Sequence, residues 1–555
     1  MTVLFHWLFS FSSLPYWAFG VLSLLFASRL TALPRTLRRL EDRFQSRSFL
    51  WLFLLSLALQ AFFSCALHWP EPRVHDEYSY LLAADTFSKG RLTNPSPALF
   101  APFESFHIFL KPTYMSKYPP AQGMVLALGS LLGAPIVGAW ILTALATALL
   151  FWALVPLLGG RWAFRAGALA AVHPLLLSWG QSYWGGSAAL CGAALVFGSV
   201  GRLRAELRPR HAVLFAVGLG ILANSRPYEG LLFSIPACLW LLFDVVKREN
   251  LWQTLGLKFV LPTSLVLAVV FSWMAYYNYR LTGDWKKLPY QVHAEQYNAV
   301  PQFVWMAPIP PKKYDRKDLE SLHAGYERWE YESQQSPVNF LKWKAAKFSI
   351  LFQQLMQPRL LLFGLLFSML GVVFTLRTLF GMSVLFLIGM LPVTYFNLHY
   401  FAPFVVLLFS MVIAGLKDFV EREGRFQGAR EVFVSLSFVW LLGPGLVLQA
   451  YLYASAERHT DPRFFSWEKL EAPIRAAAGK HILLMPCEPD NCAVVHNEAD
   501  LSAARILRAR DLGDVQNQRL FDLYPDRSKW LLVHEGPGYV AKTLATARPP
   551  QNPRL

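Results

Sequence analysis

The run IVGAWILTALATALLFWALVPLL, residues 136–158, decides the fold class of this chain. It contains no charged residue and is long enough to cross a hydrocarbon core of roughly 30 Å as one helix. Apolar runs of this kind recur from Leu4 to Tyr453. Because backbone groups in lipid must find hydrogen-bond partners within the chain, these runs are expected to be helical. The sequence therefore predicts a polytopic α-helical membrane protein of about twelve transmembrane helices.

The expected spans divide the chain into three parts. Residues 1–48 form an extra N-terminal transmembrane helix and a basic segment. Residues 49–453 form the main transmembrane domain, with outer loops at 69–135 and 278–347, and residues 454–555 form a small α/β domain. The spans are expected at about 3–27, 49–68, 136–158, 163–178, 187–201, 211–226, 229–246, 255–277, 355–376, 379–396, 401–417 and 431–453.

Composition and charge exclude a soluble or nucleic-acid-binding protein. Of 555 residues, 54% are hydrophobic and only 16% are charged, although the net charge is +16. The basic residues gather in short clusters at every second gap between apolar runs: residues 29–47, 161–165, 202–210, 247–248, 377 and 417–430. Placing these clusters in the cytoplasm satisfies the positive-inside rule and puts the N-terminus and all polar segments outside. We expect a multi-pass protein of the bacterial inner (plasma) membrane, with its active site and C-terminus extracytoplasmic.

The C-terminal segment has the texture of a small α/β domain of about 90 residues. Short apolar runs predict strands at Ile482–Met485, Ala493–Val495 and Trp530–Val533, and a helix at Ala499–Arg510. Cys487 and Cys492 bracket a polar turn there, and an oxidising compartment favours a disulfide between them. Free thiols remain open, as does a metal site that would have to recruit His481 and His496.

Asp76 and Glu77 carry the strongest chemical signal. They follow the second span by some eight residues and precede a helix expected at 78–89, which Gly90 would end. A second interfacial helix is expected at 121–132. A carboxylate at this level could act as a general base toward an incoming hydroxyl. The alternative is that Asp76 caps the helix by accepting amide hydrogen bonds.

Cationic and aromatic residues also fall on the predicted outer face. Four groups there could hold a lipid-borne phosphate, or could instead anchor at the interface: Lys111, Lys117, Arg226 and His399. The tight turns at 179–187 and 224–230 offer Tyr183, Trp184 and Glu229 to a sugar, although interfacial aromatic belts have the same composition. The loop at 278–347 contains a charged helical segment, 312–332, that could form a lid.

In chain order these features are Asp76-Glu77 with its helix, KPTYMSKYPP at 111–120, the Asn224-Ser225-Arg226-Pro227 turn and HYFAP at 399–403. In this order the chain resembles the GT-C class of membrane glycosyltransferases over about residues 49–420. Within that class it is most similar to the group of dolichyl-phosphate-mannose-protein mannosyltransferases and aminoarabinose transferases. It departs from the family by a tyrosine inside the Lys-Pro-Pro turn, an arginine for lysine at 226 and a histidine for arginine at 399.

The resemblance implies an inverting, EC 2.4-type glycosyltransferase that uses a polyprenyl-phosphate-linked sugar. Asp76 would be the catalytic base, with Glu77 beside it, and Tyr118 would contact substrate. The donor phosphate would be held by Lys111, Lys117, Arg226, His399 and Tyr400. The acceptor would be a hydroxyl of a lipid, glycan or protein, and nucleic acid is not expected as a partner.

Two other classes of function and one cofactor question stay open at this point. A transporter or flippase of a lipid-linked glycan would also need outer-face cations, and a non-catalytic membrane scaffold could use the C-terminal domain as its binding module. No metal site is predicted, because only Asp76 and Glu77 are obvious ligands, but a divalent ion used by some relatives is not excluded.

Overall fold

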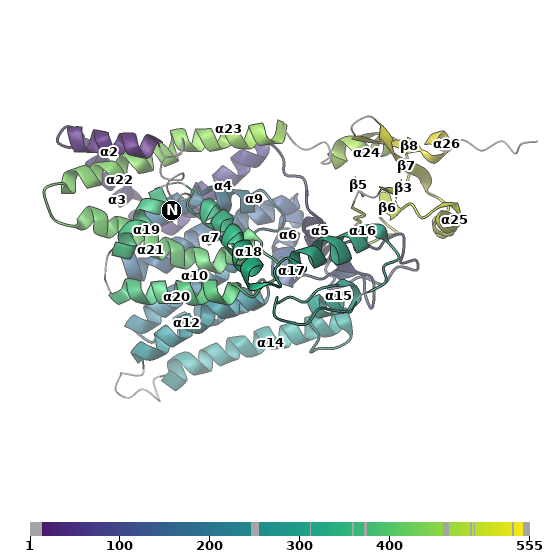
Figure 1. The fold of residues 1–555 in the computed structure, drawn as a ribbon, viewed down its shortest axis with the longest axis horizontal. Coiled ribbons are helices and arrows are strands. Elements are labelled where there is room, and N and C mark those ends of the chain that lie inside the picture. The colour runs from purple at the N-terminus through teal and green to yellow at the C-terminus, as the bar shows by residue number, and fades with distance from the viewer. Residues whose placement is uncertain are drawn as a thin grey trace, which may run out of the picture.

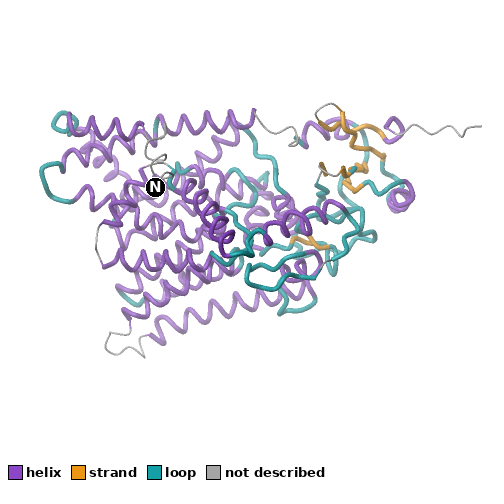
Figure 2. Tube along the Cα trace, viewed as in Figure 1, coloured by secondary structure: helices purple, strands orange, loops and turns teal. Residues whose placement is uncertain are grey.

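The computed structural model describes residues 14–245, 255–310, 312–357, 360–370, 374–458, 466–488, 491–492, 494–535 and 538–547. Helices fill most of its length, and a smaller part that holds most of the strands lies at one end (Figures 1 and 2). Within the predicted spans, residues 3–13, 246, 358–359 and 371–373 lie outside the described part of the chain, as do the basic residues Lys247 and Arg248.

Apolar helices pack side by side to form the body of the molecule. Several begin with proline in the first turn, where its missing N–H costs no intrahelical hydrogen bond. The innermost is α21, Ala402–Glu421, most of which is buried among its neighbours. The other main helices are α2 Leu14–Phe26, α4 Ser48–Phe62, α7 Pro135–Leu158, α10 Ser187–Ala205, α11 Pro209–Ala223, α12 Pro227–Val245, α14 Leu261–Thr282, α19 Leu360–Leu370, α20 Phe374–Met390, α22 Gln427–Leu442 and α23 Pro444–Arg458.

Glycine permits the tightest helix contact in this bundle. A Cβ atom added at Gly415 of α21 would stand 2.0 Å from the carbonyl oxygen of Gly364 in α19. No larger residue fits at this crossing, because the two backbones touch there. Close packing of small residues thus replaces the hydrophobic driving force that helices lack inside lipid.

Seven of the described helices are long and apolar enough to cross a membrane. Four shorter apolar helices accompany them, at Pro15–Phe26, Pro120–Leu131, Pro209–Ala223 and Arg377–Met390. The chain is therefore polytopic, while the number twelve stays a prediction. The expected span at 163–178 is wrong, because the helix breaks before Pro174 into α8, Gly160–Ala171, and α9, Pro174–Gly180. Proline cannot donate the hydrogen bond that would continue α8, and it disfavours helical geometry in the preceding residue.

The basic clusters at 29–47, 161–165 and 417–430 come together at one end of the bundle, which we call the basic end. There α3, Ala32–Phe44, lies against α8 and α22. Side chains from these helices form ion pairs: Arg165 with Glu41 at 2.6 Å, Arg161 with Asp42 at 3.0 Å, and Arg38 with Glu431 at 2.7 Å. Clusters far apart in sequence thus share one end, as the topology argument predicted.

The two long polar loops meet at the opposite end, which we call the loop end (Figure 1). The expected interfacial helices are present as α5, His75–Ser88, and α6, Pro120–Leu131. Between them β1, Ile108–Phe109, pairs with β2, Met115–Ser116. The second loop contributes α15 Pro289–Tyr297, α16 Lys317–Glu320, the π-helix η5 Ser321–Glu327, α17 Arg328–Glu332 and α18 Pro337–Leu355.

Residues 466–547, the C-terminal module, fold around a four-stranded sheet beside the loops. The strand order is β6-β3-β7-β8, with β3 parallel to both β6 and β7, and β8 antiparallel to β7. The module's elements are α24 Trp467–Ala476, β3 His481–Met485, β4 Cys487–Glu488, β5 Asn491–Cys492, β6 Ile506–Arg510, α25 Asp514–Leu523, β7 Ser528–Glu535, β8 Gly538–Thr543 and α26 Leu544–Ala547.

Two expectations for this module are wrong and two are confirmed. Residues 506–510 form the buried strand β6 and not the end of a helix, because pairing with β3 overrides local helical propensity. Val494 and Val495 follow β5 without strand pairing, and Ala493 lies outside the described residues. The strands at 482–485 and 530–533 are confirmed within β3 and β7. Cys487 is disulfide-bonded, and Cys492 is its direct partner across the β4–β5 ladder, as the predicted pairing requires.

Candidate active site

A cavity of about 590 Å³ lies at the loop end, between the bundle and the second loop. Its wall is built from the start of α5, the turn before α6, the turn between α11 and α12, the second loop and the segment before α21. Residues that matter below are Asp76, Tyr80, Lys117, Tyr118, Trp184, Arg226, Glu229, Tyr290, Glu327 and Tyr400. The volume is suited to a small-molecule group such as a sugar with its phosphate.

Asp76 lies in the first turn of α5 and faces this cavity. The hydroxyl of Tyr118 donates a hydrogen bond to its Oδ1 atom. Its Oδ2 atom lies 3.4 Å from Nδ1 of His75 and 3.6 Å from Nε2 of His107. The carboxylate is therefore held by three side chains from two separate stretches of the first loop.

These neighbours favour the ionised form of Asp76. Burial alone would raise its pKa, but the His107 and His75 rings and the Tyr118 hydroxyl together hold the pKa well below the usual carboxyl value. Burial, followed by the negative charge of Asp76, raises the pKa of Tyr118, which therefore stays protonated and donates. Asp76 is thus an anionic acceptor directed at the cavity near neutral pH.

His107 sits in an uncommon backbone conformation to reach Asp76. Its φ angle is +59°, in the left-handed region that non-glycine residues rarely adopt. Its carbonyl oxygen accepts hydrogen bonds from the Ser79 hydroxyl at 2.6 Å and from the Lys117 amide at 3.1 Å. Burial and then the charge of Lys117 lower the pKa of the His107 ring well below its usual value, whereas the charge of Asp76 opposes that change.

Glu77, expected beside Asp76 as part of the catalytic pair, turns the other way. Its Oε2 atom accepts the backbone amides of Arg73 at 2.7 Å and Val74 at 3.3 Å, and Oε1 accepts that of Tyr183 at 2.9 Å. It does not line the cavity. The capping role that the sequence left open therefore belongs to Glu77, which satisfies free amides at the start of α5.

Two of the four expected cations line the cavity. The Lys117 ammonium lies 5.3 Å from the ring centroids of both Tyr118 and Tyr290, and the Arg226 guanidinium lies 4.6 Å from that of Tyr400. Within the described part of the chain neither cation forms an ion pair. Burial lowers the pKa of Lys117, while the charges of Glu327 and Asp76 oppose that change. Because unpaired buried charge is costly, such cations are suited to an anionic ligand.

The remaining candidates divide between cavity and scaffold. Tyr118, Trp184 and Glu229, which were predicted to bind substrate, line the cavity, and so does Tyr400, which was predicted to bind the donor phosphate. Lys111 is exposed at 4.0 Å from the Phe100 ring, and it does not line the cavity. His399 is buried with its ring 4.4 Å from that of Trp184, one layer behind the wall. Tyr183 is also buried there, and its hydroxyl donates to the carbonyl of Pro70.

Sequence reasoning missed part of the site. His75 could have been identified because it directly precedes Asp76 in the sequence. Nothing in the sequence marks His107 as part of the site. Glu327 and Glu330 come from η5 and α17 in the predicted lid segment, and Tyr395 precedes α21. A π-helix such as η5 is uncommon and often occurs at functional sites. The second loop thus supplies acidic and aromatic groups to the cavity wall.

Asp76 and the two histidines beside it could also hold a divalent cation. Nδ1 of His75 and Nε2 of His107 are 2.8 Å apart, and each is within 3.6 Å of Oδ2 of Asp76. Together they are a group of metal-type ligands whose atoms all lie within 4.8 Å of one another. Two imidazoles and a carboxylate fit a transition metal such as zinc. The sequence-based search for ligands, which found only Asp76 and Glu77, was therefore incomplete.

No protein-family model and no curated protein matches this chain. Among solved structures, it is similar to ArnT from Cupriavidus metallidurans in the apo state, with a TM-score of 0.46 and 12% identity over 90% of this chain and 99% of that one. It is also similar to the Archaeoglobus fulgidus oligosaccharyltransferase in complex with Zn and sulfate, with a TM-score of 0.42 and 12% identity. That match covers 78% of this chain and 60% of the other, so the chain spans well under two thirds of the oligosaccharyltransferase.

Another ArnT structure from Cupriavidus metallidurans, bound to undecaprenyl phosphate, matches with a TM-score of 0.45 and 13% identity over 90% of this chain and 99% of that one.

Proposed function

We propose that this protein is an inverting glycosyltransferase that moves a sugar from a polyprenyl-phosphate carrier to a hydroxyl of a lipid, glycan or protein acceptor. One observation carries the proposal. The ionised Asp76 and the cations Lys117 and Arg226, which have no ion-pair partner among the described residues, line the same cavity. A base and an anion-binding wall around one space are what transfer from a sugar phosphate to a hydroxyl requires.

In the proposed reaction Asp76 is the general base. It takes the proton of the acceptor hydroxyl while the acceptor oxygen forms a bond to the anomeric carbon. The bond between that carbon and the phosphate oxygen breaks, and its electron pair leaves with the polyprenyl phosphate. A single displacement of this kind inverts the anomeric configuration. The low pKa of Asp76 keeps the carboxylate ionised before the acceptor arrives, and its contacts with His75 and Tyr118 fix its direction.

Arg226 and Lys117 serve the leaving group. Negative charge grows on the phosphate oxygens as the bond breaks, and fixed cations in a partly buried wall stabilise this charge without reorganising. Arg226 lies over the Tyr400 ring, which limits its freedom before substrate arrives. A divalent cation held by His75, Asp76 and His107 would add positive charge beside the reacting groups.

The proposed side of the membrane for the cavity rests on the positions of the basic clusters and of the cavity itself. The paired basic clusters lie at the basic end, and the cavity lies at the loop end. The positive-inside rule then favours a cavity on the extracytoplasmic face of the bacterial inner membrane, where a lipid-linked donor can enter from the outer leaflet.

Purified protein incubated with a panel of polyprenyl-phosphate-linked sugars and lipid or glycan acceptors tests the proposal. We expect release of free polyprenyl phosphate with at least one donor, and no release by Asp76→Asn. Transfer of an intact lipid-linked sugar across proteoliposomes, without cleavage of any donor, would instead establish a transporter and overturn the proposal.

A further inference from the structure

Helix α5 presents two functional faces. Asp76 and Tyr80, one turn apart, line the cavity. Tyr78, Leu82 and Asp85 fall at the i, i+4 and i+7 positions of another face, and each of them contacts the C-terminal module. The helix that carries the proposed base is therefore held along two turns by a part of the chain some 400 residues away.

At the start of the helix the contact is aromatic and hydrogen-bonded. Nε1 of Trp467 donates to the Tyr78 hydroxyl at 2.6 Å, and that hydroxyl donates to the Pro72 carbonyl at 3.0 Å. The His496 ring lies 4.4 Å from the Tyr78 ring and 4.5 Å from the Trp467 ring. Tyr78 is only two residues from Asp76, so these contacts fix the backbone just beyond the base.

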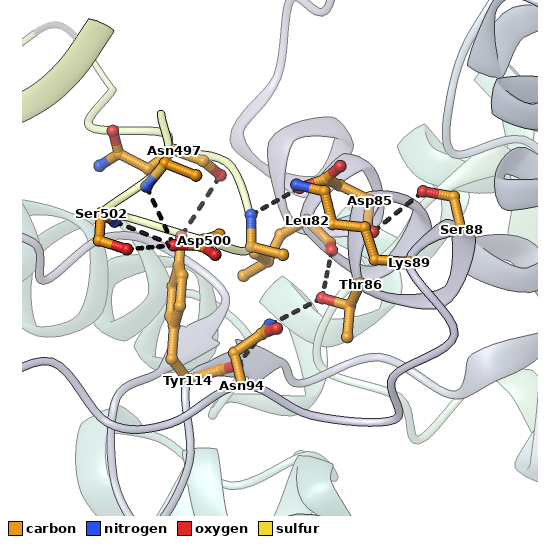
Figure 3. Close-up of polar contacts among 12 residues, drawn as sticks. Leu82, Asp85, Thr86, Ser88, Lys89, Asn94, Tyr114, Asn497, Asp500 and Ser502 are labelled. Atoms are coloured by element: carbon orange, nitrogen blue, oxygen red, sulfur yellow. Dashed lines mark hydrogen bonds and ion pairs between the residues drawn. The ribbon is translucent and has the colours of Figure 1, made fainter. Parts of the chain in front are cut away.

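Farther along, the module shares a core with the first loop. Leu82 belongs to one buried cluster with Ile482, Leu484 and Leu507 of the sheet. Oδ2 of Asp85 accepts the Ala499 amide at 2.7 Å, and the Tyr114 hydroxyl donates to the Asn497 carbonyl at 3.3 Å (Figure 3). Buried apolar area and directional hydrogen bonds together define one docking geometry.

The module also holds the second loop. Arg510 of β6 pairs with Asp318 of α16 at 2.9 Å, and Arg316 pairs with the same carboxylate. All three side chains are almost fully buried. Arg316 also donates to the Glu104 carbonyl, and the Arg510 amide donates to that of Pro102 at 2.8 Å. A single module thus contacts both loops that form the cavity wall.

We propose that the C-terminal module is the positioning element of the active site, acting on Asp76 through the Tyr78, Leu82 and Asp85 face of α5. Tyr78 and Trp467 are then positioning residues, since neither touches the reacting groups. The kinetic part of this inference rests on the proposed glycosyltransferase function, but the docking itself does not. Loss of one contact would allow Asp76 to move relative to its His107 and Tyr118 partners.

Two matched tryptophan variants test the proposal. Trp467→Phe keeps an aromatic ring but removes the N–H that reaches Tyr78. Trp530→Phe is the control, because Trp530 packs on the same module core and its Nε1 donates only within the sheet, to His481 at 3.3 Å. We expect Trp467→Phe to lower kcat on the order of 10-fold with little change in donor KM, since small misplacements of a reacting group are costly. Trp530→Phe should keep the wild-type kcat and donor KM.

Hydrogen exchange separates this proposal from the proposed function, because it needs no substrate. The peptide covering residues 76–88 should exchange faster in Trp467→Phe than in Trp530→Phe, at comparable melting temperatures. Asp85→Asn keeps an acceptor for the Ala499 amide, so the 76–88 peptide should remain protected from exchange. Asp85→Ala removes that acceptor, and the peptide should lose its protection. Equal exchange in both tryptophan variants, or equal kcat, overturns the positioning role. Absence of transfer by wild type together with altered exchange overturns only the glycosyltransferase assignment.

Discussion

The basic end and the cavity of this molecule use arginine and lysine in opposite ways. At the basic end the cations meet carboxylates: Arg165 with Glu41, Arg161 with Asp42, and Arg38 with Glu431. At the loop end Arg226 and Lys117 line a cavity, and within the described part of the chain neither has an ion-pair partner. The residue types are the same, but the two cavity cations, unlike these three arginines, have no carboxylate partner among the described residues.

This difference has a thermodynamic meaning. A paired, half-buried cation contributes to holding helices together, and breaking the pair leaves a carboxylate uncompensated. A cation that lacks a partner in a cavity costs stability until an anion binds, so its presence indicates function and not structure. Replacing a paired cation should therefore lower stability and leave activity unchanged. Replacing a cavity cation should lower activity without lowering stability.

The largest effect is expected at Asp76, the anion that faces the unpaired cations. Asp76→Asn should lower transfer by about 10²- to 10⁴-fold, because the amide cannot accept the acceptor proton. The rate at which purified protein releases polyprenyl phosphate measures this loss of transfer. Glu77→Gln is the control: it loses an acceptor for the backbone amides at the start of α5, so it should lower the melting temperature and retain more turnover than Asp76→Asn. Near-normal turnover of Asp76→Asn at normal folding would remove Asp76 from the mechanism.

A smaller kinetic effect with a contrasting stability effect is expected for the arginines. Arg226→Ala should lower kcat/KM for the donor by about 10²-fold, since charge-assisted phosphate contact is lost, while its melting temperature stays equal or rises. The kcat/KM of Arg226→Lys should lie between those of wild type and Arg226→Ala, because lysine keeps the charge but not the bidentate geometry. Arg165→Ala should do the reverse, losing roughly 1–3 kcal/mol of stability with turnover of the folded protein unchanged. If Arg226→Ala and Arg165→Ala changed both melting temperature and turnover in the same way, the distinction between cavity cations and paired cations would be wrong.

The smallest effect concerns the pH dependence of turnover. Because the pKa of Asp76 is held below the usual carboxyl value, the base stays ionised as pH falls, and kcat should decline only at a pH below that at which an ordinary carboxyl group titrates. Tyr118→Phe removes a hydrogen bond to the ionised form, so the pKa rises and the acid limb moves to higher pH. Profiles of kcat against pH for wild type and Tyr118→Phe measure this shift. An unchanged acid limb would show that Asp76 is not the group that titrates.

Much of the architecture could be predicted because it depends on local properties. The two interfacial helices, the strands at 482–485 and 530–533 and the gathering of the basic clusters follow from apolar run length, turn residues and charge position. The break before Pro174 and the strand at 506–510 could not be predicted as firmly, since both depend on packing or pairing that overrides helical appearance. Long-range pairing has no signature in a single segment.

The candidate site divides in the same manner. Sequence order and chemistry pointed to Asp76, Lys117 and Arg226, all of which line one cavity. Sequence could not separate Asp76 from Glu77, because adjacent residues on a helix differ only in the direction that packing gives each side chain. Nor could it find His107, whose role depends on an uncommon backbone angle and on a loop that returns to α5.

By itself, the sequence determined that this is a multi-span membrane protein with a carboxylate and cations on its polar loops, because hydropathy and charge act residue by residue along the chain. Only the tertiary structure decided which carboxylate faces the cavity, which cations lack a carboxylate partner and which distant module holds α5. Those facts depend on distances between segments far apart in sequence, and such distances exist only once the chain has packed.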